Sequence, residues 1–178
     1  DHGINLSRGF TAVLGALDAA EAKAATPGAI LTLTGNTLIS KVGGASGPLY
    51  GTAFRRAGKA LGGAADVDLA ALSAALDAAL AGVQQLGAAR EGDKTMVDAL
   101  APAARAFSKA IAAGAPPDDA LSVLVEAATA GAAATVPMQA LKGRASYLGP
   151  RSVGHEDPGA VSTALILGAL ADAAQAGR

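Results

Sequence analysis

The chain has 178 residues, of which 51% are hydrophobic and 3% aromatic, and its formal net charge is −1. This balanced charge, without a cluster of Lys and Arg, argues against a nucleic-acid ligand, because backbone binding requires a basic surface. The absence of Cys excludes disulfides and thiol chemistry and fits a cytoplasmic location, and no uncharged apolar run reaches the roughly 18 residues of a membrane span.

Apolar residues recur at helical spacing along the chain, whereas alternating β-branched runs are almost absent. The sequence therefore predicts an all-α protein whose core is built from Ala, Leu, Val and Ile. Stretches rich in Gly and Pro divide the pattern into about seven helices. These helices are expected to begin near Phe10, Pro27, Pro48, Asp68, Thr95, Asp118 and Pro158.

Helix-capping signatures mark several of these starts. Thr26 before Pro27 is typical of an N-cap followed by a first-turn proline. Either Asp66 or Asp68 is expected to cap the fourth helix, and Asp157 to cap the last.

Two further expectations concern helix interiors. Pro102 lies within the fifth apolar pattern and should kink that helix, because proline lacks an N–H and clashes with the preceding turn. The last helix is expected to bury Val161, Leu165 and Leu170.

Short connections make sequential helices antiparallel, which predicts an up-and-down helical bundle or barrel forming one domain over residues 1–178. Alternate connections of such a bundle lie at the same end. Four polar, glycine-containing stretches are therefore expected to converge there: residues 1–9, 43–47, 87–95 and 143–159. The chain opens on Asp1 rather than Met, so we expect further residues upstream in the parent protein.

The long connection between Lys142 and Ala160 departs most from the alanine-rich background. It carries two arginines, a histidine, two acids and a tyrosine between two helical patterns. Irregular connections of this length are uncommon in compact domains and are usually functional or disordered. Its varied composition favours an ordered functional loop over a surface linker.

The Gly43–Gly47 stretch presents small residues immediately before a predicted helix. A helix N-terminus offers free N–H groups and a positive dipole end, which suit a phosphate group. The alternative is an ordinary glycine turn in which Ser46 is the N-cap, and the spacing does not fit a P-loop. Asp1 is a possible Mg²⁺ ligand, although a single carboxylate is not a site.

His2 and His155 are the only histidines. Their separation and the lack of Cys argue against a zinc site. A triad of Ser152, His155 and Asp157 is disfavoured because such short spacing within one loop seldom gives the required geometry.

Arg144 and Arg151 could neutralise phosphate oxygens or could be ordinary surface arginines. On residue type alone, Leu86 and Met96 are more typical of a core than of a ligand pocket.

Four segments together resemble one family, the L subunit or nucleotide-binding domain of dihydroxyacetone kinases. They are DHGINLSRGF at residues 1–10, VGGASGPLYGT at 42–52, GDKTMVDAL at 92–100 and KGRASYLGPRSVGHEDPGA at 142–160. They span nearly the whole chain in the family's order. The resemblance implies an antiparallel barrel of eight helices, with the first helix lying upstream of this chain.

The resemblance also implies that ADP or ATP and two Mg²⁺ ions are bound at one end of the barrel. Asp1 matches the last of the family's three metal-binding aspartates, and the other two would lie upstream. The positions implied to contact the nucleotide are His2, Gly3, Ile4, Asn5, Ala45, Ser46, Gly87, Met96, Arg144, Asp157, Pro158 and Gly159. Arg144 is implied to face the phosphates and to act in catalysis.

The implied reaction is phosphoryl transfer from ATP to dihydroxyacetone, which the family holds on a histidine of a separate K subunit or domain. Neither His2 nor His155 matches that histidine. The implied partners are therefore the K subunit and, where ADP is rephosphorylated in place, the phosphotransferase-system protein DhaM. Alternatives are a nucleotide-dependent regulatory module and a kinase domain for another small ketose.

Overall fold

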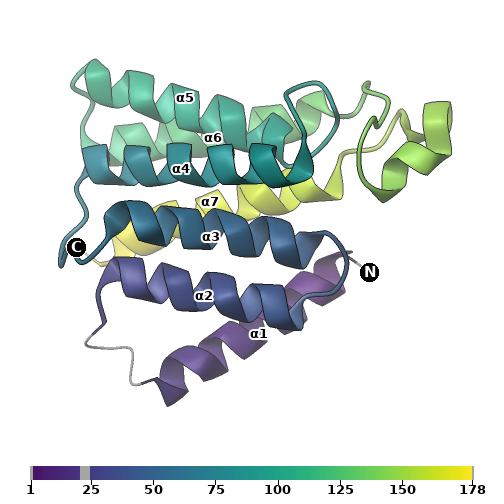
Figure 1. Ribbon diagram of the computed structural model, residues 1–178. Coiled ribbons are helices and arrows are strands. Elements are labelled where there is room, and N and C mark those ends of the chain that lie inside the picture. The colour runs from purple at the N-terminus through teal and green to yellow at the C-terminus, as the bar shows by residue number, and fades with distance from the viewer. Residues whose placement is uncertain (1, 21–24, 178) are drawn as a thin grey trace. The chain divides into compact units, whose positions relative to one another are not determined.

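A computed structural model describes residues 2–20 and 25–177 of the chain. Within these ranges every regular element is helical, which confirms the all-α prediction (Figure 1). The elements are α1 (His2–Ala19), α2 (Pro27–Lys41), α3 (Ser46–Leu61), α4 (Leu69–Gly87), α5 (Val97–Ala112), α6 (Pro117–Ala134), the 3₁₀ segment η2 (Arg144–Ser152) and α7 (Pro158–Ala176).

The chain divides into two compact units, residues 1–88 and residues 89–178. The first contains α1 to α4, and the second contains α5 to α7 with η2. The prediction of a single domain over residues 1–178 stays a prediction, which the cooperativity of unfolding would test.

Glycines set the close packing of α2 on α3 in the first unit. These two helices lie side by side in Figure 1. A Cβ atom on Gly35 would come within 2.5 Å of the carbonyl oxygen of Gly51, and one on Gly58 within 2.6 Å of that of Gly28. Helices approach this closely only where side chains are absent at the crossing, so the glycine-rich composition is a packing requirement.

The second unit is built around α5. Its Ala99 packs against Ala132 of α6 and Ala160 of α7, and all three are buried. Phe107 of α5 is fully buried. A Cβ atom on Gly131 of α6 would lie 3.1 Å from the ring of Pro102, so a glycine leaves room for the proline. The α5 helix continues without a break through Pro102, and the predicted kink there stays a prediction.

All three capping predictions are confirmed. The Thr26 hydroxyl accepts from the N–H of Ala29 at 3.3 Å. Of the two candidates for α4, Asp68 is the cap, accepting from the N–H of Ala71 at 2.7 Å. Asp157 caps α7.

Three helix starts differ from the sequence prediction, and α3 is one of them, since it begins at Ser46 rather than Pro48. The first helix begins at His2, so most of the polar stretch 1–9 is helical rather than a loop. The α5 helix begins at Val97, because hydrogen bonds from the preceding loop to Asp98 fold residues 92–95 into a turn.

The prediction for the core face of α7 was wrong for Leu165, whereas Val161 is partly buried and packs against the Ala99, Ala132 and Ala160 cluster, and Leu170 is half-buried. The buried residues of α7 are Ala160, Thr163, Leu167 and Ala171, whereas the Leu165 side chain is 69% exposed. The helix is apolar on nearly every side, so periodicity does not single out the face that packs.

Two helices, α4 and α7, are long and apolar enough to cross a membrane by length and composition. Each carries one Asp within this length, Asp77 and Asp172. Core helices of soluble proteins pass the same test, so this is weak evidence for a span.

Candidate functional site

In the first unit, the start of α1 meets the start of α3. Nδ1 of His2 lies 3.1 Å from the hydroxyl oxygen of Ser46, across 44 positions of sequence. Burial lowers the pKa of His2 below 6.5, so its ring is neutral at neutral pH. A neutral imidazole exchanges donor and acceptor roles with a hydroxyl, and the pair therefore joins the two helix starts by a polar contact.

The N-terminus of α3 is not capped by a side chain. The N-cap is Ala45, and Ser46 is the first helical residue, so the alternative in which Ser46 caps the helix was wrong. Pro48 has no N–H, so the first-turn donors are the N–H groups of Ser46 and Gly47, and no side-chain cap accepts from them. Such donors favour an anion.

The backbone around this terminus requires glycine at one position in particular. A Cβ atom on Gly47 would overlap the carbonyl oxygen of Val42, whereas one on Gly43 would meet nothing within 4 Å. The chain therefore doubles back tightly before α3, and the residues just ahead of the helix stay open.

The other predicted residues of the first unit lie at helix ends. Gly3, Ile4 and Asn5 occupy the first turn of α1, where Ile4 is 68% exposed and Asn5 is half-buried. Gly87 is the last residue of α4, and Ala88 after it adopts a left-handed conformation with φ of 47°.

A large hollow of the first unit lies elsewhere. It is an open groove of about 1230 Å³ along α2, α3 and α4, with Arg55, Arg56 and Lys59 on its lining. None of the predicted site residues lines it. This groove therefore does not coincide with the predicted site.

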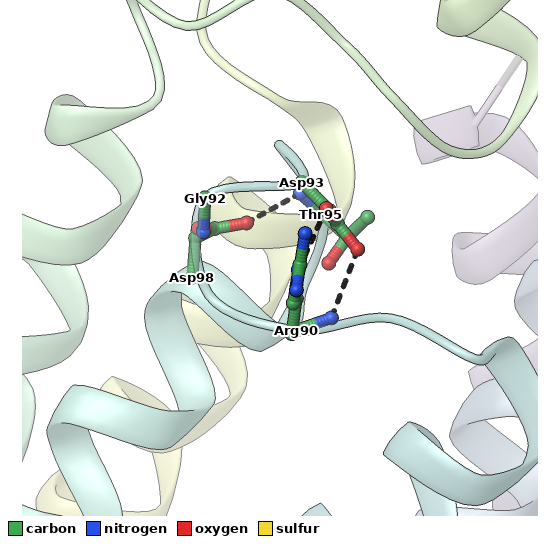
Figure 2. Close-up of polar contacts among 5 residues, drawn as sticks. All are labelled: Arg90, Gly92, Asp93, Thr95 and Asp98. Atoms are coloured by element: carbon green, nitrogen blue, oxygen red, sulfur yellow. Dashed lines mark hydrogen bonds and ion pairs between the residues drawn. The ribbon is translucent and has the colours of Figure 1, made fainter.

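In the second unit, Asp98 organises the loop that precedes α5. Its carboxylate accepts from the N–H of Gly92 at 2.5 Å and from the N–H of Thr95 at 2.7 Å (Figure 2). In the same loop, Asp93 accepts from the N–H of Arg90 at 3.0 Å. Asp98 is buried, and both of its carboxylate oxygens are satisfied by these backbone donors.

Lys94 of the same loop is buried, with only 3% of its surface exposed. Its Nζ donates to the carbonyl oxygen of Met138 at 3.0 Å and to that of Ser152 at 2.5 Å. Lys94 also adopts a left-handed conformation with φ of 61°, which a non-glycine residue keeps only where its surroundings hold it.

The segment from 138 to 157 is tied down at both ends. The buried Ser152 hydroxyl accepts from the N–H of Ala140 at 2.9 Å and donates to the carbonyl oxygen of Gly149 at 2.6 Å. Thr135 is fully buried, and its hydroxyl accepts from the N–H of Asp157 at 2.8 Å. The long connection is thus an ordered element that contains η2.

Asp157 caps α7 in a buried setting. Its carboxylate accepts from the N–H of Ala160 at 2.7 Å. Burial raises the pKa of Asp157 above 3.8, and the Asp98 carboxylate raises it further. The N–H groups of Ala160 and Gly159 and the charge of Lys94 act in the opposite direction.

Met96 and Gly159 are brought together in this unit. A Cβ atom on Gly159 would lie 3.3 Å from the backbone nitrogen of Met96, so glycine allows the starts of α5 and α7 to approach closely. Met96 is buried, as a core residue would be, whereas Leu86 is 52% exposed.

The remaining predicted residues lie at the surface of the second unit. Arg144 begins η2 and is exposed, and Pro158 at the start of α7 is exposed as well. His155 is exposed, and the hydroxyl of Ser152 is engaged by Ala140 and Gly149. The disfavoured triad is therefore not assembled.

The sequence matches the DAK2 domain over residues 1–172. This chain belongs to the DAK2 domain family. It is 43% identical over 175 residues to the PEP-dependent dihydroxyacetone kinase, ADP-binding subunit DhaL, of Escherichia coli strain K12. That match covers 98% of this chain and 82% of the relative. An L-erythrulose 1-kinase of Mycolicibacterium smegmatis is 40% identical over 97% of this chain and 30% of its own length.

Solved structures of the dihydroxyacetone kinase of C. freundii resemble this DAK2 domain. The native form gives a TM-score of 0.61 and the complex with AMP-PNP and Mg²⁺ a TM-score of 0.57, both at 32% identity over 83% of this chain. The match spans 24% of the chain of the native form. The likeness supports the helical fold of the domain.

The DAK2 domain also contains buried polar residues that the sequence analysis did not place in the site, although it considered Ser152 in the disfavoured triad. They are Lys94, Asp98, Thr135 and Ser152, all of them buried polar residues with named partners. Three of them lie in or beside the segments that carry the family resemblance, where polar residues interrupt an alanine-rich background. Their burial depends on tertiary contacts, so the sequence offers only that local signal.

Proposed function

We propose that this chain is the nucleotide-binding subunit or domain of a dihydroxyacetone kinase. It would hold Mg-ADP or Mg-ATP and donate the γ-phosphate to dihydroxyacetone bound on a partner K subunit. The 43% identity to an ADP-binding subunit over nearly the whole chain supports this reading. The observation that carries it is the uncapped N-terminus of α3 beside the contact between His2 and Ser46.

In the first unit, the proposal assigns the phosphate-facing role to the starts of α1 and α3. The N–H groups of the first turn of α3, together with Ser46, are hydrogen-bond donors suited to phosphate oxygens. His2, Gly3, Ile4 and Asn5 are assigned to the same group, and Ala45 to the wall beside it. Gly87 is assigned to the nucleobase.

In the second unit, the proposal assigns Arg144 to the phosphate charge and Met96 to the nucleobase. The charge that develops on a transferring phosphoryl group is stabilised by preorganised cations and N–H donors rather than by covalent chemistry. The proposal also assigns the start of α7 to the edge of the nucleotide, through Asp157, Pro158 and Gly159. The Asp157 cap holds this helix start in place.

The proposed Mg²⁺ ions would require oxygen ligands, chiefly carboxylates. Over residues 2–20 and 25–177, no group of three His, Cys, Asp or Glu could hold a metal ion. Asp1, the predicted ligand, lies outside the described residues. We therefore assign no step of the reaction to Mg²⁺ and expect its ligands to need carboxylates beyond those described.

A partner K subunit is part of the proposal, with the phosphotransferase-system protein DhaM as a second partner and the cytoplasm as the location. Large apolar side chains are exposed around η2, where Tyr147 is 88% and Leu148 is 46% exposed. Exposed apolar groups beside an arginine are typical of protein interfaces. This surface supports a protein partner near Arg144.

A second candidate is a kinase domain for another small ketose. The 40% identity to an L-erythrulose 1-kinase favours it, and this identity is close to that of the dihydroxyacetone kinase subunit. In either case the ketose would be held outside this chain, so the residues described here serve both reactions equally.

The deciding experiment is reconstitution of the full-length protein with a K subunit and a phosphoryl donor. Dihydroxyacetone and L-erythrulose are supplied separately, and the sugar phosphate is measured. Formation of dihydroxyacetone phosphate is the expected result, and preference for L-erythrulose would favour the second candidate. Nucleotide binding without sugar phosphate under any donor would instead identify a nucleotide-dependent regulatory module.

A further inference from the structure

We propose that Lys94 is a positioning residue that holds the η2 segment, and with it Arg144, in place. Its ammonium group joins Met138 and Ser152, which lie on either side of residues 139–151. Arg144 lies within that interval, at the start of η2. One buried cation thus ties together the two ends of the segment.

The contact geometry supports a structural clamp rather than a surface charge. Lys94 is 3% exposed, and both partners of its Nζ named here are backbone carbonyl oxygens. Charged donors make stronger hydrogen bonds than neutral ones, and the effect grows where water is excluded. Removing the ammonium would leave the buried carbonyl oxygen of Ser152 and the part-buried carbonyl oxygen of Met138 without this donor.

Neighbouring hydrogen bonds show that the clamp is part of a built network. The N–H of Leu141 donates to the carbonyl oxygen of Asp93 at 3.0 Å, next to Lys94 in the chain. The Ser152 hydroxyl accepts from the N–H of Ala140, so it also links the two ends of the segment. The left-handed backbone conformation of Lys94 is unfavourable for a lysine. The hydrogen bonds around the residue hold it in this conformation.

Burial also argues against a direct contact between Lys94 and a substrate. Its Nζ is occupied by two carbonyl oxygens within the protein, so it acts through the segment that it holds and not on a substrate. The clamp is inferred from contacts within the protein without nucleotide. Its effect on nucleotide binding rests on the proposed function, because that role belongs to Arg144.

The first test measures amide hydrogen exchange in the full-length protein without nucleotide. Lys94→Met keeps most of the side-chain volume and removes the charge and the donors. Amides of residues 139–156 should exchange at least about tenfold faster, while those in the middle of α5 and α6 keep their protection. Lys109→Met is the matched control, because Lys109 is exposed near the end of α5. Unchanged exchange at residues 139–156 would overturn the clamp.

A conservative series keeps the test decisive if Lys94→Met fails to fold. Lys94→Gln keeps an N–H₂ donor without the charge and should give exchange between that of the wild type and that of a full loss. Lys94→Arg keeps both the charge and several donors and should protect residues 139–156 better than Lys94→Gln. The reverse order of the two variants would contradict a charge-assisted clamp.

The second test separates positioning from general stability. Mg-ADP affinity is measured for Lys94→Met, Arg144→Ala and the double variant. If Lys94 acts through Arg144, the double variant binds as weakly as Arg144→Ala alone, whereas fully additive losses would overturn the positioning role. If Arg144→Ala binds normally while exchange still rises in Lys94→Met, the clamp stands and the proposed role of Arg144 fails.

Discussion

The hydroxyl group of Thr135 accepts a hydrogen bond of 2.8 Å from the backbone N–H of Asp157, which joins the end of α6 to the start of α7. Thr135 is fully buried and donates in turn to the carbonyl oxygen of Ala132 at 2.6 Å. This side chain therefore satisfies a backbone donor at the point where the long connection enters α7.

Replacing Thr135 tests this link. Thr135→Val keeps the shape but leaves the Asp157 N–H buried without its acceptor, and should lower the free energy of unfolding by about 1–3 kcal/mol. Thr135→Ser keeps the hydroxyl and loses one methyl group, at about 0.8 kcal/mol. Urea unfolding measures both variants. A valine variant at least as stable as the serine variant would show that the hydrogen bond contributes little.

The contribution of Asp157 to the free energy of unfolding should depend on pH. Because burial raises the folded-state pKa of Asp157 above 3.8, folding favours its protonated form. The resulting stability is fully present below the unfolded pKa and is lost as the pH rises through the folded pKa. Asp157→Asn caps about as well but does not titrate.

The measurement is urea unfolding of the wild type and of Asp157→Asn from about pH 3 to about pH 7. The stability of the wild type relative to Asp157→Asn should decline as the pH rises from 3.8 upward. Asp157→Ala should cost about 1 kcal/mol through the lost cap. A wild-type advantage that grows with pH would mean that the carboxylate is favoured by folding.

Loss of one acceptor oxygen at Asp98 should lower the free energy of unfolding. Asp98→Asn places an N–H₂ group against the N–H of Gly92 or of Thr95, where two donors face each other. We expect about 1–3 kcal/mol of destabilisation in urea unfolding. Asp119→Asn, in the exposed first turn of α6, is the control and should have little effect. Equal stability of the two variants would argue against the loop-organising role of Asp98.

Arg144 should affect turnover more than stability. Because its side chain is exposed, Arg144→Ala should leave the melting temperature nearly unchanged. Phosphoryl transfer should fall by about 10²-fold or more, as when one preorganised donor is removed. Arg151→Ala, in the same η2 segment, should retain most activity. Unaltered turnover in Arg144→Ala would remove Arg144 from the site.

Gly47 and Gly43 form a matched pair before α3. Gly47→Ala would push a Cβ atom into the Val42 carbonyl oxygen and should destabilise the fold, whereas Gly43→Ala meets open space. The second change should be neutral or stabilise by up to about 1 kcal/mol, because it restricts the unfolded chain. Thermal unfolding compares them, and equal melting temperatures would argue against the tight turn.

Helix boundaries were largely predictable because their causes are local. The side chains of Thr26, Asp68 and Asp157 each accept from an N–H three residues further along, so the pattern needs no knowledge of the fold. The start of α1 was harder to place. Polar residues such as Asn5 and Ser7 resemble a loop in sequence, although the buried Leu6, Gly9 and Val13 give the segment one packed face.

The candidate site was predictable only in part. The segments that carry it could be recognised as polar interruptions of an alanine-rich chain, and Arg144 and Asp157 stood out within them. The contact between Ser46 and His2 spans 44 positions, so only folding determines it. The exposure of Leu165 has the same origin, since a helix apolar all round is oriented by its neighbours.

By itself, then, the amino-acid sequence determined the helical class, the caps and the polar connections, because propensity, capping and turn chemistry act over a few residues. The tertiary structure decided which polar groups became buried. Lys94 is the clearest case, since its place in a polar segment does not by itself distinguish it from a surface lysine. Its ammonium is buried because Met138 and Ser152, far along the chain, bring two carbonyl oxygens to it.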